Sequence, residues 1–420
     1  MSALLDELKE TISGCSRCGF CMVRCPSYNA TKYEWDAARG RIRLAKDLVE
    51  GNRIIDQELK DPIDTCLMCR SCYENCPSGV DTPKAIQLMR IIRYREGKMK
   101  PPYRLLFEKV FTHPNLMSFG TSMMSSAQNI GLDKWGLGVA ARMIPEAGAV
   151  ARIIPQLPAK SARKQLPVFN AAVGTKRGKV LYFLGCATNL AYPDAAKSLV
   201  KFMQSQGVEV TIPNVSCCGL PAYMYGHIDV AQKLAARNIA AMDVSNYDAV
   251  ISDCPTCLAF LQEYPDLFAE GESNEKAQAL SAKVKDVPEY ILNLGLLEPK
   301  HEFNKTITYH QPCHTGRYLK TGSQNEQLIK SLPGIQFIPA ENQNDCCGGA
   351  GSYCVTQPDR SQKILTRKLQ GIAKTNADIL VTNCPACIIQ LRSGINNSED
   401  PQVKKIQVLN LMNLLASVYA

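Results

Sequence analysis

Eight of the nineteen cysteines in this chain fall in two runs with the same spacing. Each run reads C-x2-C-x2-C-x3-C and ends directly before a proline. The first run is Cys15, Cys18, Cys21 and Cys25 before Pro26, and the second is Cys66, Cys69, Cys72 and Cys76 before Pro77. Thiolates at this spacing are typical ligands of a pair of [4Fe–4S] clusters, which transfer single electrons. The two runs therefore predict electron transfer through the protein.

The spacing also predicts which thiolates share a cluster. Three cysteines two residues apart wrap around one cube, whereas the fourth lies too far along the chain and serves the other cube. We therefore assign the first cubane cluster to Cys15, Cys18, Cys21 and Cys76, and the second to Cys66, Cys69, Cys72 and Cys25. Zinc is the alternative, although it needs neither the third cysteine nor the proline. A disulfide framework is disfavoured, since nothing at the N-terminus reads as a signal peptide.

The composition is typical of a soluble globular protein with two or three domains. The 420 residues are 45% hydrophobic and 21% charged, with a formal net charge of +9. No apolar stretch reaches the roughly 18 residues needed to cross a bilayer, so we expect a cytoplasmic protein. The apolar segment 116–154 predicts a packed helix pair, with peripheral contact to the inner face of the cell membrane as the alternative. Basic residues at 84–104 and 152–179 predict solvated helix faces or a surface for an acidic partner or lipid, and no nucleic-acid-binding motif accompanies them.

Helical periodicity and prolines define the first two regions of the chain. Residues 1–100 are predicted to form an all-helical ferredoxin domain, because the segment between the cysteine runs is too long and too helical for a compact β-rich ferredoxin. Helices are predicted at 36–50 and 83–93. Residues 101–176 are predicted to form a helical connector. Its Gly136-Leu-Gly138 only superficially matches a dinucleotide-binding fingerprint, because no strand precedes it, and we expect no FAD or NAD on this chain.

The rest of the chain is an internal repeat, predicted as two α/β domains at 177–300 and 301–420. Corresponding cysteines are separated by 127 residues (186 to 313), 129 residues (217 to 346) and 130 residues (254 to 384 and 257 to 387). Strands are predicted at 180–184, 208–212 and 249–252, and again at 307–309, 335–338 and 379–382. Helices are predicted between them at 195–206, 230–242, 327–332 and 361–373. This alternation predicts a parallel sheet with covering helices in each unit, with the cysteines at the carboxyl ends of the strands.

The C…CCG…CxxC pattern of each unit resembles the cysteine-rich (CCG) domain of heterodisulfide reductase and its relatives. The resemblance implies a noncubane [4Fe–4S] cluster in each unit, with zinc as the alternative. The five implied ligands are Cys186, Cys217, Cys218, Cys254 and Cys257 in the first unit, and Cys313, Cys346, Cys347, Cys384 and Cys387 in the second. We expect His310 and His314 to pack beside Cys313, with proton transfer or ligation as alternatives. Cys354 fits neither pattern and is predicted to be a buried free thiol.

The order of these regions resembles that of the iron–sulfur subunit of glycolate oxidase (glycolate dehydrogenase) over essentially the whole chain. The segments that carry the resemblance are Cys18-Gly-Phe-Cys21, Arg39-Gly-Arg-Ile42, Cys66-Leu-Met-Cys69, Cys76-Pro-Ser-Gly-Val80 and Cys346-Cys-Gly-Gly-Ala-Gly351. The iron–sulfur subunits of lactate dehydrogenases and of anaerobic glycerol-3-phosphate dehydrogenase share the architecture, so they are alternatives.

The resemblance implies an oxidoreductase subunit whose substrate is oxidised on a partner. An FAD-containing subunit would oxidise glycolate, lactate or a similar 2-hydroxy acid, and this chain would pass the electrons to a quinone or another carrier. We assign no catalytic residue to the chain itself. Some members of the family have lost cysteines from the CxxC elements, whereas both are complete here, so a heterodisulfide-reductase-like activity stays open. Arg39, Arg41 and Arg70 are candidates to balance cluster charge, with structural salt bridges as the alternative.

Overall fold

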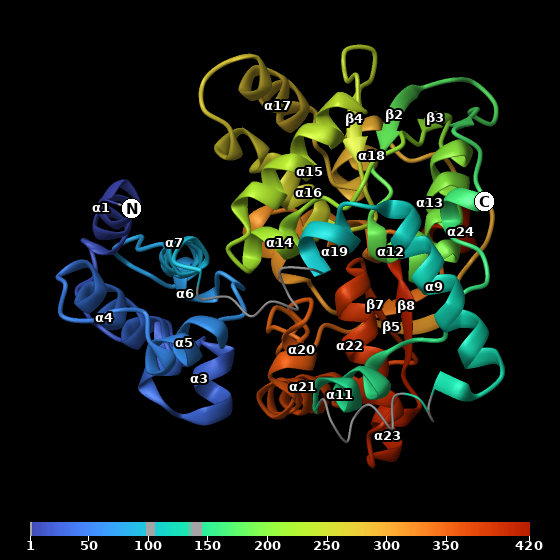
Figure 1. Cartoon of the computed structure of the whole chain (residues 1–420). Coiled ribbons are helices and arrows are strands. Elements are labelled where there is room, and N and C mark those ends of the chain that lie inside the picture. Colours follow the sequence, from blue (N-terminus) through green and yellow to red (C-terminus); the bar gives the residue numbers. More distant parts are fainter. Residues whose placement is uncertain (1, 98–105, 134–135, 137–144) are drawn as a thin grey trace.

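A computed structural model describes residues 2–97, 106–133, 136 and 145–420. Figure 1 shows the N-terminal helices in blue beside two α/β units that run from green to red. Within the described ranges, no helix is long and apolar enough to cross a membrane. The predicted glycine motif at 136–138 lies outside these ranges except for its first residue.

The described N-terminal residues, 2–97, form helices and no strand. Helices α1, α4 and α7 pack together around an apolar core that includes Leu8, Ile42 and Met89. The predicted helices at 36–50 and 83–93 correspond to α4 and α7. The helices are α1 (Ser2–Ile12), α2 (Phe20–Val23), α3 (Pro26–Thr31), η1 (Glu34–Asp36), α4 (Ala38–Val49), α5 (Gln57–Asp64), α6 (Ser71–Glu74) and α7 (Thr82–Arg95).

The described part of the connecting region is mostly helical. It contains η2 (Leu106–Phe111), which is a π-helix, α9 (Pro114–Asn129), α11 (Pro145–Ile153) and η3 (Ala162–Lys164). Helix α11 packs on α20 and α22 of the second α/β unit. Three large apolar side chains of α9, Leu116, Phe119 and Met123, are exposed.

The first α/β unit is built on a four-stranded sheet of order β1-β3-β2-β4. Strand β1 is antiparallel to β3, and the other pairs are parallel. Because β1 begins at residue 169, this sheet starts inside the segment predicted as connector. The strands are β1 (Phe169–Asn170), β2 (Gly178–Tyr182), β3 (Val208–Thr211) and β4 (Ala249–Ile251). The helices are α12 (Cys186–Ala191), α13 (Pro193–Ser205), α14 (Leu220–Met224), α15 (Ile228–Ala240), α16 (Pro255–Gln262), η4 (Tyr264–Leu267), α17 (Glu272–Lys283) and α18 (Val287–Leu294).

The second unit repeats this plan with an all-parallel sheet of order β6-β5-β7-β8. The strands predicted in both units are confirmed to within two residues, whereas β8 and the helix after it were not predicted. The strands are β5 (Lys305–Tyr309), β6 (Ile335–Phe337), β7 (Ile379–Thr382) and β8 (Gln407–Asn410). The helices are η5 (His314–Tyr318, a π-helix), α19 (Gly322–Lys330), α20 (Tyr353–Thr356), α21 (Pro358–Ala373), α22 (Pro385–Asn396), α23 (Pro401–Lys404) and α24 (Leu411–Tyr419).

The two units share one hydrophobic core. Buried side chains of both sheets, such as Val180 and Ile307, belong to the same apolar cluster. Helix α13 of the first unit packs along α24, the last helix of the second. The rings of Phe202 and Tyr419 meet across this contact with their centroids 5.6 Å apart.

The N-terminal helices dock on both α/β units. On the first unit, Arg90 of α7 donates to the Met224 carbonyl oxygen at 2.8 Å. On the second unit, α3 packs against α21, and Arg360 of α21 forms an ion pair with Asp61 at 3.1 Å. This docking places the second cysteine run next to the second α/β unit, where Cys69 packs in one apolar cluster with Cys313 and Cys346.

Candidate iron–sulfur centres

The eight cysteines of the two runs surround two adjacent cavities among the N-terminal helices. The first cavity is lined by Cys15, Cys18, Cys21 and Cys76, and the second by Cys25, Cys66, Cys69 and Cys72. Cys72 also reaches the wall of the first cavity. The structure thus brings together the two sets that the spacing predicts, with one thiol of each set supplied by the other run.

The two runs fold into the same strained loop. The residue before the second cysteine of each run has a left-handed backbone, with φ 58° at Arg17 and 54° at Met68. The residue after that cysteine is also left-handed, with φ 87° at Gly19 and 57° at Arg70. A left-handed residue other than glycine costs about 1–2 kcal/mol, and such strain concentrates at functional sites. The left-handed backbone recurs at equivalent positions of the two runs, which indicates that both loops turn their thiols toward the cavities.

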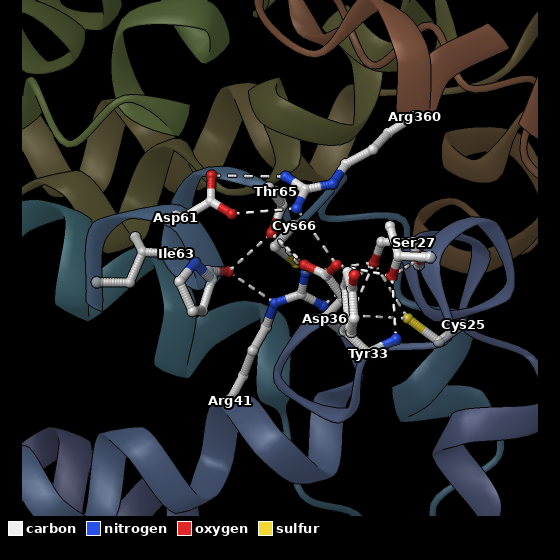
Figure 2. A network of polar contacts seen from close by, with 12 residues as sticks. Cys25, Ser27, Tyr33, Asp36, Arg41, Asp61, Ile63, Thr65, Cys66 and Arg360 are labelled. Atoms are coloured by element: carbon white, nitrogen blue, oxygen red, sulfur yellow. Dashed lines mark hydrogen bonds and ion pairs between the residues drawn. The ribbon is translucent and has the colours of Figure 1, made fainter. Parts of the chain in front are cut away.

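A buried arginine lies beside the second cavity (Figure 2). Arg41 is 2% exposed and donates from Nε to the Pro62 carbonyl oxygen at 2.8 Å and from Nη2 to the Thr65 hydroxyl at 3.1 Å. It also pairs with the buried Asp36 at 3.7 Å. The backbone oxygen of Asp36 in turn accepts from the Cys25 thiol at 3.4 Å.

This network sets the charge around the second cavity. Burial lowers the pKa of Arg41, but the neighbouring groups Cys66, Cys25 and Asp36 raise it above the usual value, so the guanidinium stays charged. Arg360 from α21 extends the network, since it lies 3.5 Å from a carboxylate oxygen of Asp36. A buried positive charge therefore lies near two of the predicted thiolate ligands, Cys25 and Cys66.

The other two candidate arginines both line a cavity and form a salt bridge. Arg39 lines the first cavity and pairs with Glu34 at 2.7 Å. Arg70 lines the second cavity and pairs with Asp81 at 3.1 Å. Both sequence alternatives, charge balance and structural ion pair, are thus compatible with where these side chains lie.

The cysteines of the two runs differ in exposure and in acidity. Burial raises the pKa of Cys69 and raises that of Cys72 well above its usual range. Cys18 is exposed, and a hydrogen bond from the Phe20 backbone lowers its pKa. Because a metal must displace the proton of a thiol to bind it, the exposed Cys18 is easier to metallate than the buried Cys69 and Cys72. The first cavity opens to solvent at Cys18, whereas the second lies against the α/β units.

In the first α/β unit, the five predicted cysteines form one connected group. The Sγ atoms of Cys186 and Cys217 are 3.8 Å apart. Hydrogen bonds from Cys217 and then Cys257 lower the pKa of Cys218 to about 6, and Cys257 also contacts Cys254. As predicted, they lie at strand ends and helix starts: Cys186 begins α12 and Cys254 caps α16.

The second unit repeats this arrangement. The Sγ atoms of Cys347 and Cys387 are 3.5 Å apart, and hydrogen bonds from Cys346 and then Cys387 lower the pKa of Cys347 well below its usual value. Cys384 caps α22 and contacts Cys387. Cys313 lies in the same small apolar cluster as Cys346.

Glycines after the paired cysteines allow this close packing. Gly219 and Gly348 have φ 98° and 84°, values that favour glycine. A Cβ atom on Gly348 would lie 2.9 Å from the Ser361 carbonyl oxygen. A side chain at Gly348 would therefore collide with the neighbouring backbone.

The two histidines have different surroundings. One ring nitrogen of His310 and the Sγ atoms of Cys347 and Cys387 all lie within 4.8 Å of one another, and His310 is 1% exposed. His314 instead stacks on Tyr318, with centroids 4.6 Å apart, and its Nδ1 lies 3.2 Å from the Thr256 hydroxyl. The Nδ1 atom of His314 also lies 3.6 Å from the Sγ atom of Cys313. Both histidines therefore pack beside predicted ligands, His310 beside Cys347 and Cys387 and His314 beside Cys313.

The repeat also differs at positions that the sequence reasoning missed. Where the second unit has Asn383, the first has Asp253, whose carboxylate accepts from the hydroxyls of Tyr182 at 2.7 Å and Thr188 at 2.5 Å. Behind the paired cysteines, the second unit has the buried Lys368 on α21, where α15 of the first has Asn238. Aligning the two copies at the 130-residue offset would have revealed both differences.

The four groups of cysteines form a continuous series through the molecule. Cys72 lines both cavities of the N-terminal helices. Cys69 shares an apolar cluster with Cys313 and Cys346 of the second unit. Thr256 of the first unit lies 3.7 Å from the sulfur of Cys384 in the second. Within the part of the chain that the structure describes, each group of cysteines is therefore linked to the next by a shared cavity, a shared apolar cluster or a direct side-chain contact.

The residues present fit sulfur-ligated metal. All nineteen cysteines are free thiols, and all except Cys354 belong to one of the four groups. Cys354 is a buried free thiol, as predicted, and burial raises its pKa to about 11. Convergent free thiols are the donor set that iron–sulfur clusters require.

Comparisons with known proteins agree with this arrangement. The model of the 4Fe-4S dicluster domain matches residues 11–80, and that of the cysteine-rich domain, CCG, matches 180–262 and 307–392. The chain is 24% identical to one of the subunits of the fumarate reductase (CoM/CoB) of Methanothermobacter marburgensis, over 97% of this chain and 73% of that protein.

Two further relatives match nearly the whole chain over nearly their whole length. The glycolate oxidase iron-sulfur subunit of Escherichia coli is 26% identical, over 92% of this chain and 91% of that protein. The "Probable glycolate oxidase iron-sulfur subunit" of Bacillus subtilis is 30% identical, over 99% of this chain and 97% of that protein. With its dicluster region and both cysteine-rich domains in place, the chain belongs to the family of glycolate oxidase iron–sulfur subunits.

Proposed function

We propose that this chain is the electron-transfer subunit of a flavin-dependent 2-hydroxy-acid dehydrogenase complex. A partner subunit that holds FAD oxidises glycolate or lactate, and this chain carries the electrons one at a time toward a quinone or another carrier. The observation that carries the proposal is the continuous series of four cysteine groups. A series of this kind suits electron transfer, whereas a single isolated group would suit a structural metal.

The N-terminal cysteines would hold two cubane [4Fe–4S] clusters, which supply one-electron redox chemistry when bound. Cys15, Cys18, Cys21 and Cys76 would hold the first, and Cys66, Cys69, Cys72 and Cys25 the second. Arg41 would offset the negative charge of thiolates in the second site, which favours the more negatively charged reduced state and so raises the reduction potential. The docked α/β units would exclude water from this site, and that desolvation acts in the opposite direction because it disfavours added charge.

The ten cysteines of the α/β units would hold two noncubane [4Fe–4S] clusters. The lowered pKa values of Cys218 and Cys347 support thiolate ligation at equivalent positions in both units. Zinc in these units is the alternative. Iron and zinc analysis of protein purified without oxygen separates the alternatives, because four clusters require about sixteen irons and two require about eight.

The electron-transfer role is tested with the complex itself. The chain is purified anaerobically with its flavoprotein partner, and cluster reduction is followed by visible absorbance and EPR after glycolate or lactate is added. We expect reduction of the clusters on a timescale of turnover. A preparation with full iron content that accepts no electrons from the reduced flavoprotein would contradict the proposal.

A second candidate function is reduction of a disulfide at one of the α/β units. Both five-cysteine groups are complete, and the chain has a relative that belongs to a CoM/CoB fumarate reductase. The assay supplies a reduced dye as electron donor and measures thiol release from a disulfide. Inertness toward disulfides in a preparation with about sixteen irons would exclude this candidate.

A further inference from the structure

A cleft lies between the N-terminal helices and the second α/β unit, at the edge of two of the cysteine groups. It has a volume of about 490 Å³ and is bounded by α3 on one side and α21 on the other. The sulfur-bearing residues Cys69 and Cys346 both line it. A molecule in this cleft would therefore contact residues of two predicted cluster sites. This volume is in the range of small-molecule binding sites, about 300–1,000 Å³.

The lining of the cleft is strongly basic. Its charged residues are one acid, Asp345, and five bases, Arg24, Arg317, Lys363, Arg367 and Lys368. The apolar side chains of Val23 and Ile364 also reach it. This mixture of cations and apolar groups suits an organic anion better than it suits a metal ion.

Two of the five cations are already engaged with the protein. Arg317 donates to the Cys69 carbonyl oxygen at 3.1 Å and to the Asn344 carbonyl oxygen at 2.5 Å. Lys368 is buried and donates to the carbonyl oxygens of Asn342 and Gln343. These two side chains lie next to the paired cysteines, and they hold the inner wall of the cleft in place.

The other three cations, Arg24, Lys363 and Arg367, have no partner within the described ranges. Their side chains form no hydrogen bond or ion pair within the part of the chain that the structure describes, and all three are exposed. Lys363 and Arg367 lie one turn apart on α21, and Arg24 faces them from the turn before α3. Three unpaired cations on two opposite walls form an arrangement that a multiply charged anion can bridge, with charge-assisted hydrogen bonds to each wall.

We propose that this cleft binds a small organic anion that carries several carboxylate or phosphate groups, in contact with Cys69 and Cys346. Such a site lies beyond the proposed electron-transfer role, because it adds a small-molecule ligand that electron transfer does not require. The site does not depend on which metal the cysteines hold.

The proposal is tested by calorimetry on the anaerobically purified full chain at low ionic strength. The probes are citrate, which carries carboxylates, and pyrophosphate, which carries phosphates, and glycerol is the neutral control. We expect saturable binding of one anion or both with one site per chain, and the stronger of the two identifies the ligand chemistry. Absence of saturable binding by either probe overturns the proposal.

Two variants probe the two walls separately. Lys363→Gln with Arg367→Gln removes the cations of α21, and Arg24→Gln removes the cation opposite. Each hydrogen bond to a charged group is worth about 1.5–3 kcal/mol, so we expect each variant to weaken binding about tenfold or more. These side chains are exposed and have no partner among the described residues, so both variants should fold. Iron content and circular dichroism check that they do.

The matched control is Lys201→Gln with Lys233→Gln, which removes two exposed cations from helices α13 and α15 of the first α/β unit, neither of which lines the cleft. We expect this control to bind the probe as the parent chain does. Equal loss in the control would show that only net charge matters, and unchanged binding in both cleft variants would show that the anion binds elsewhere. A third result, loss of affinity for the flavoprotein partner with no anion bound, would assign these cations to a protein interface. Each of these results overturns the proposal.

Discussion

Replacement of Arg41 by glutamine should destabilise the N-terminal helices and remove metal from the second cavity. The substitution removes the bonds to the Pro62 carbonyl and to the hydroxyls of Thr65 and Ser27, and the ion pair with Asp36. Loss of one partner of a buried ion pair costs about 3–5 kcal/mol. That cost is large beside the total stability of a domain, about 5–15 kcal/mol.

The lower end of this range applies here, because Asp36 keeps other partners. Its carboxylate still accepts from Thr31 at 2.7 Å and from Thr65 at 2.8 Å, and Arg360 still lies 3.5 Å away. We therefore expect a loss of about 3 kcal/mol. Since Arg41 lies beside Cys25 and the second cavity, the iron content should also fall by about four atoms, one cluster, while the first cavity stays loaded.

The matched control is Arg43→Gln on the same helix. Arg43 is exposed and pairs with Asp47, four residues on, at 2.9 Å, which is its only ion pair among the residues that the structure describes. Its loss should therefore cost less than about 0.5 kcal/mol. Anaerobic guanidinium unfolding, followed by circular dichroism and cluster absorbance, measures both variants. Equal midpoints and equal iron contents for Arg41→Gln and Arg43→Gln would refute the reasoning.

Three further predictions concern acidity, the unassigned thiol and the asymmetry of the repeat. Burial raises the pKa of the half-buried Glu263 to about 7, so the folded state holds a proton that the unfolded state releases above about 4.5. The free energy of unfolding should then fall as the pH rises from about 4.5 to about 7. Glu263→Gln should abolish this pH dependence and, after allowance for partial exposure, stabilise the protein by about 1–2 kcal/mol at pH 8 in urea unfolding. An unchanged pH dependence in the variant would contradict this. Cys354→Ala should retain the full iron content, and a loss of about four irons would make Cys354 a ligand. Asp253→Asn removes a buried carboxylate that acts on Cys254 and should raise the reduction potential of the first α/β unit, and Asn383→Asp should lower that of the second. Each shift should be on the order of 50 mV, about a tenfold change in a one-electron equilibrium. EPR-monitored titration measures both, and shifts of the same sign would refute the assignment.

The sequence predicted the parts of the fold and site that depend on short-range pattern. In each C-x2-C-x2-C-x3-C run, the first three thiols lie close together in sequence and the fourth lies further along. This spacing alone indicated which thiols would share a cavity. The strands before the two CxxC elements, β4 (Ala249–Ile251) and β7 (Ile379–Thr382), are nearly continuous apolar runs, and they were placed correctly because buried parallel strands read in this way.

Features that depend on long-range packing were not predictable from the same patterns. Strand β1 has only two residues, Phe169 and Asn170, and exists because β3 pairs with it. Strand β8 and helix α24 lie after the last cysteine, so no motif marked them. The network of Arg41 and the basic cleft at Arg24 and Lys363 join residues that are distant in sequence, and only the docking of the N-terminal helices brings them together.

The shared core of the two α/β units has a consequence for how this repeat can change over time. A duplicated unit with a core of its own can be lost, replaced or expressed alone. Here the last helix of the second copy, α24, covers α13 of the first, and Asn413 donates to Ser198 across that contact at 3.1 Å. Deleting either copy would uncover the apolar face of the other. We therefore expect the two copies to be kept together in evolution, even though they differ in buried charge at Asp253 and Lys368.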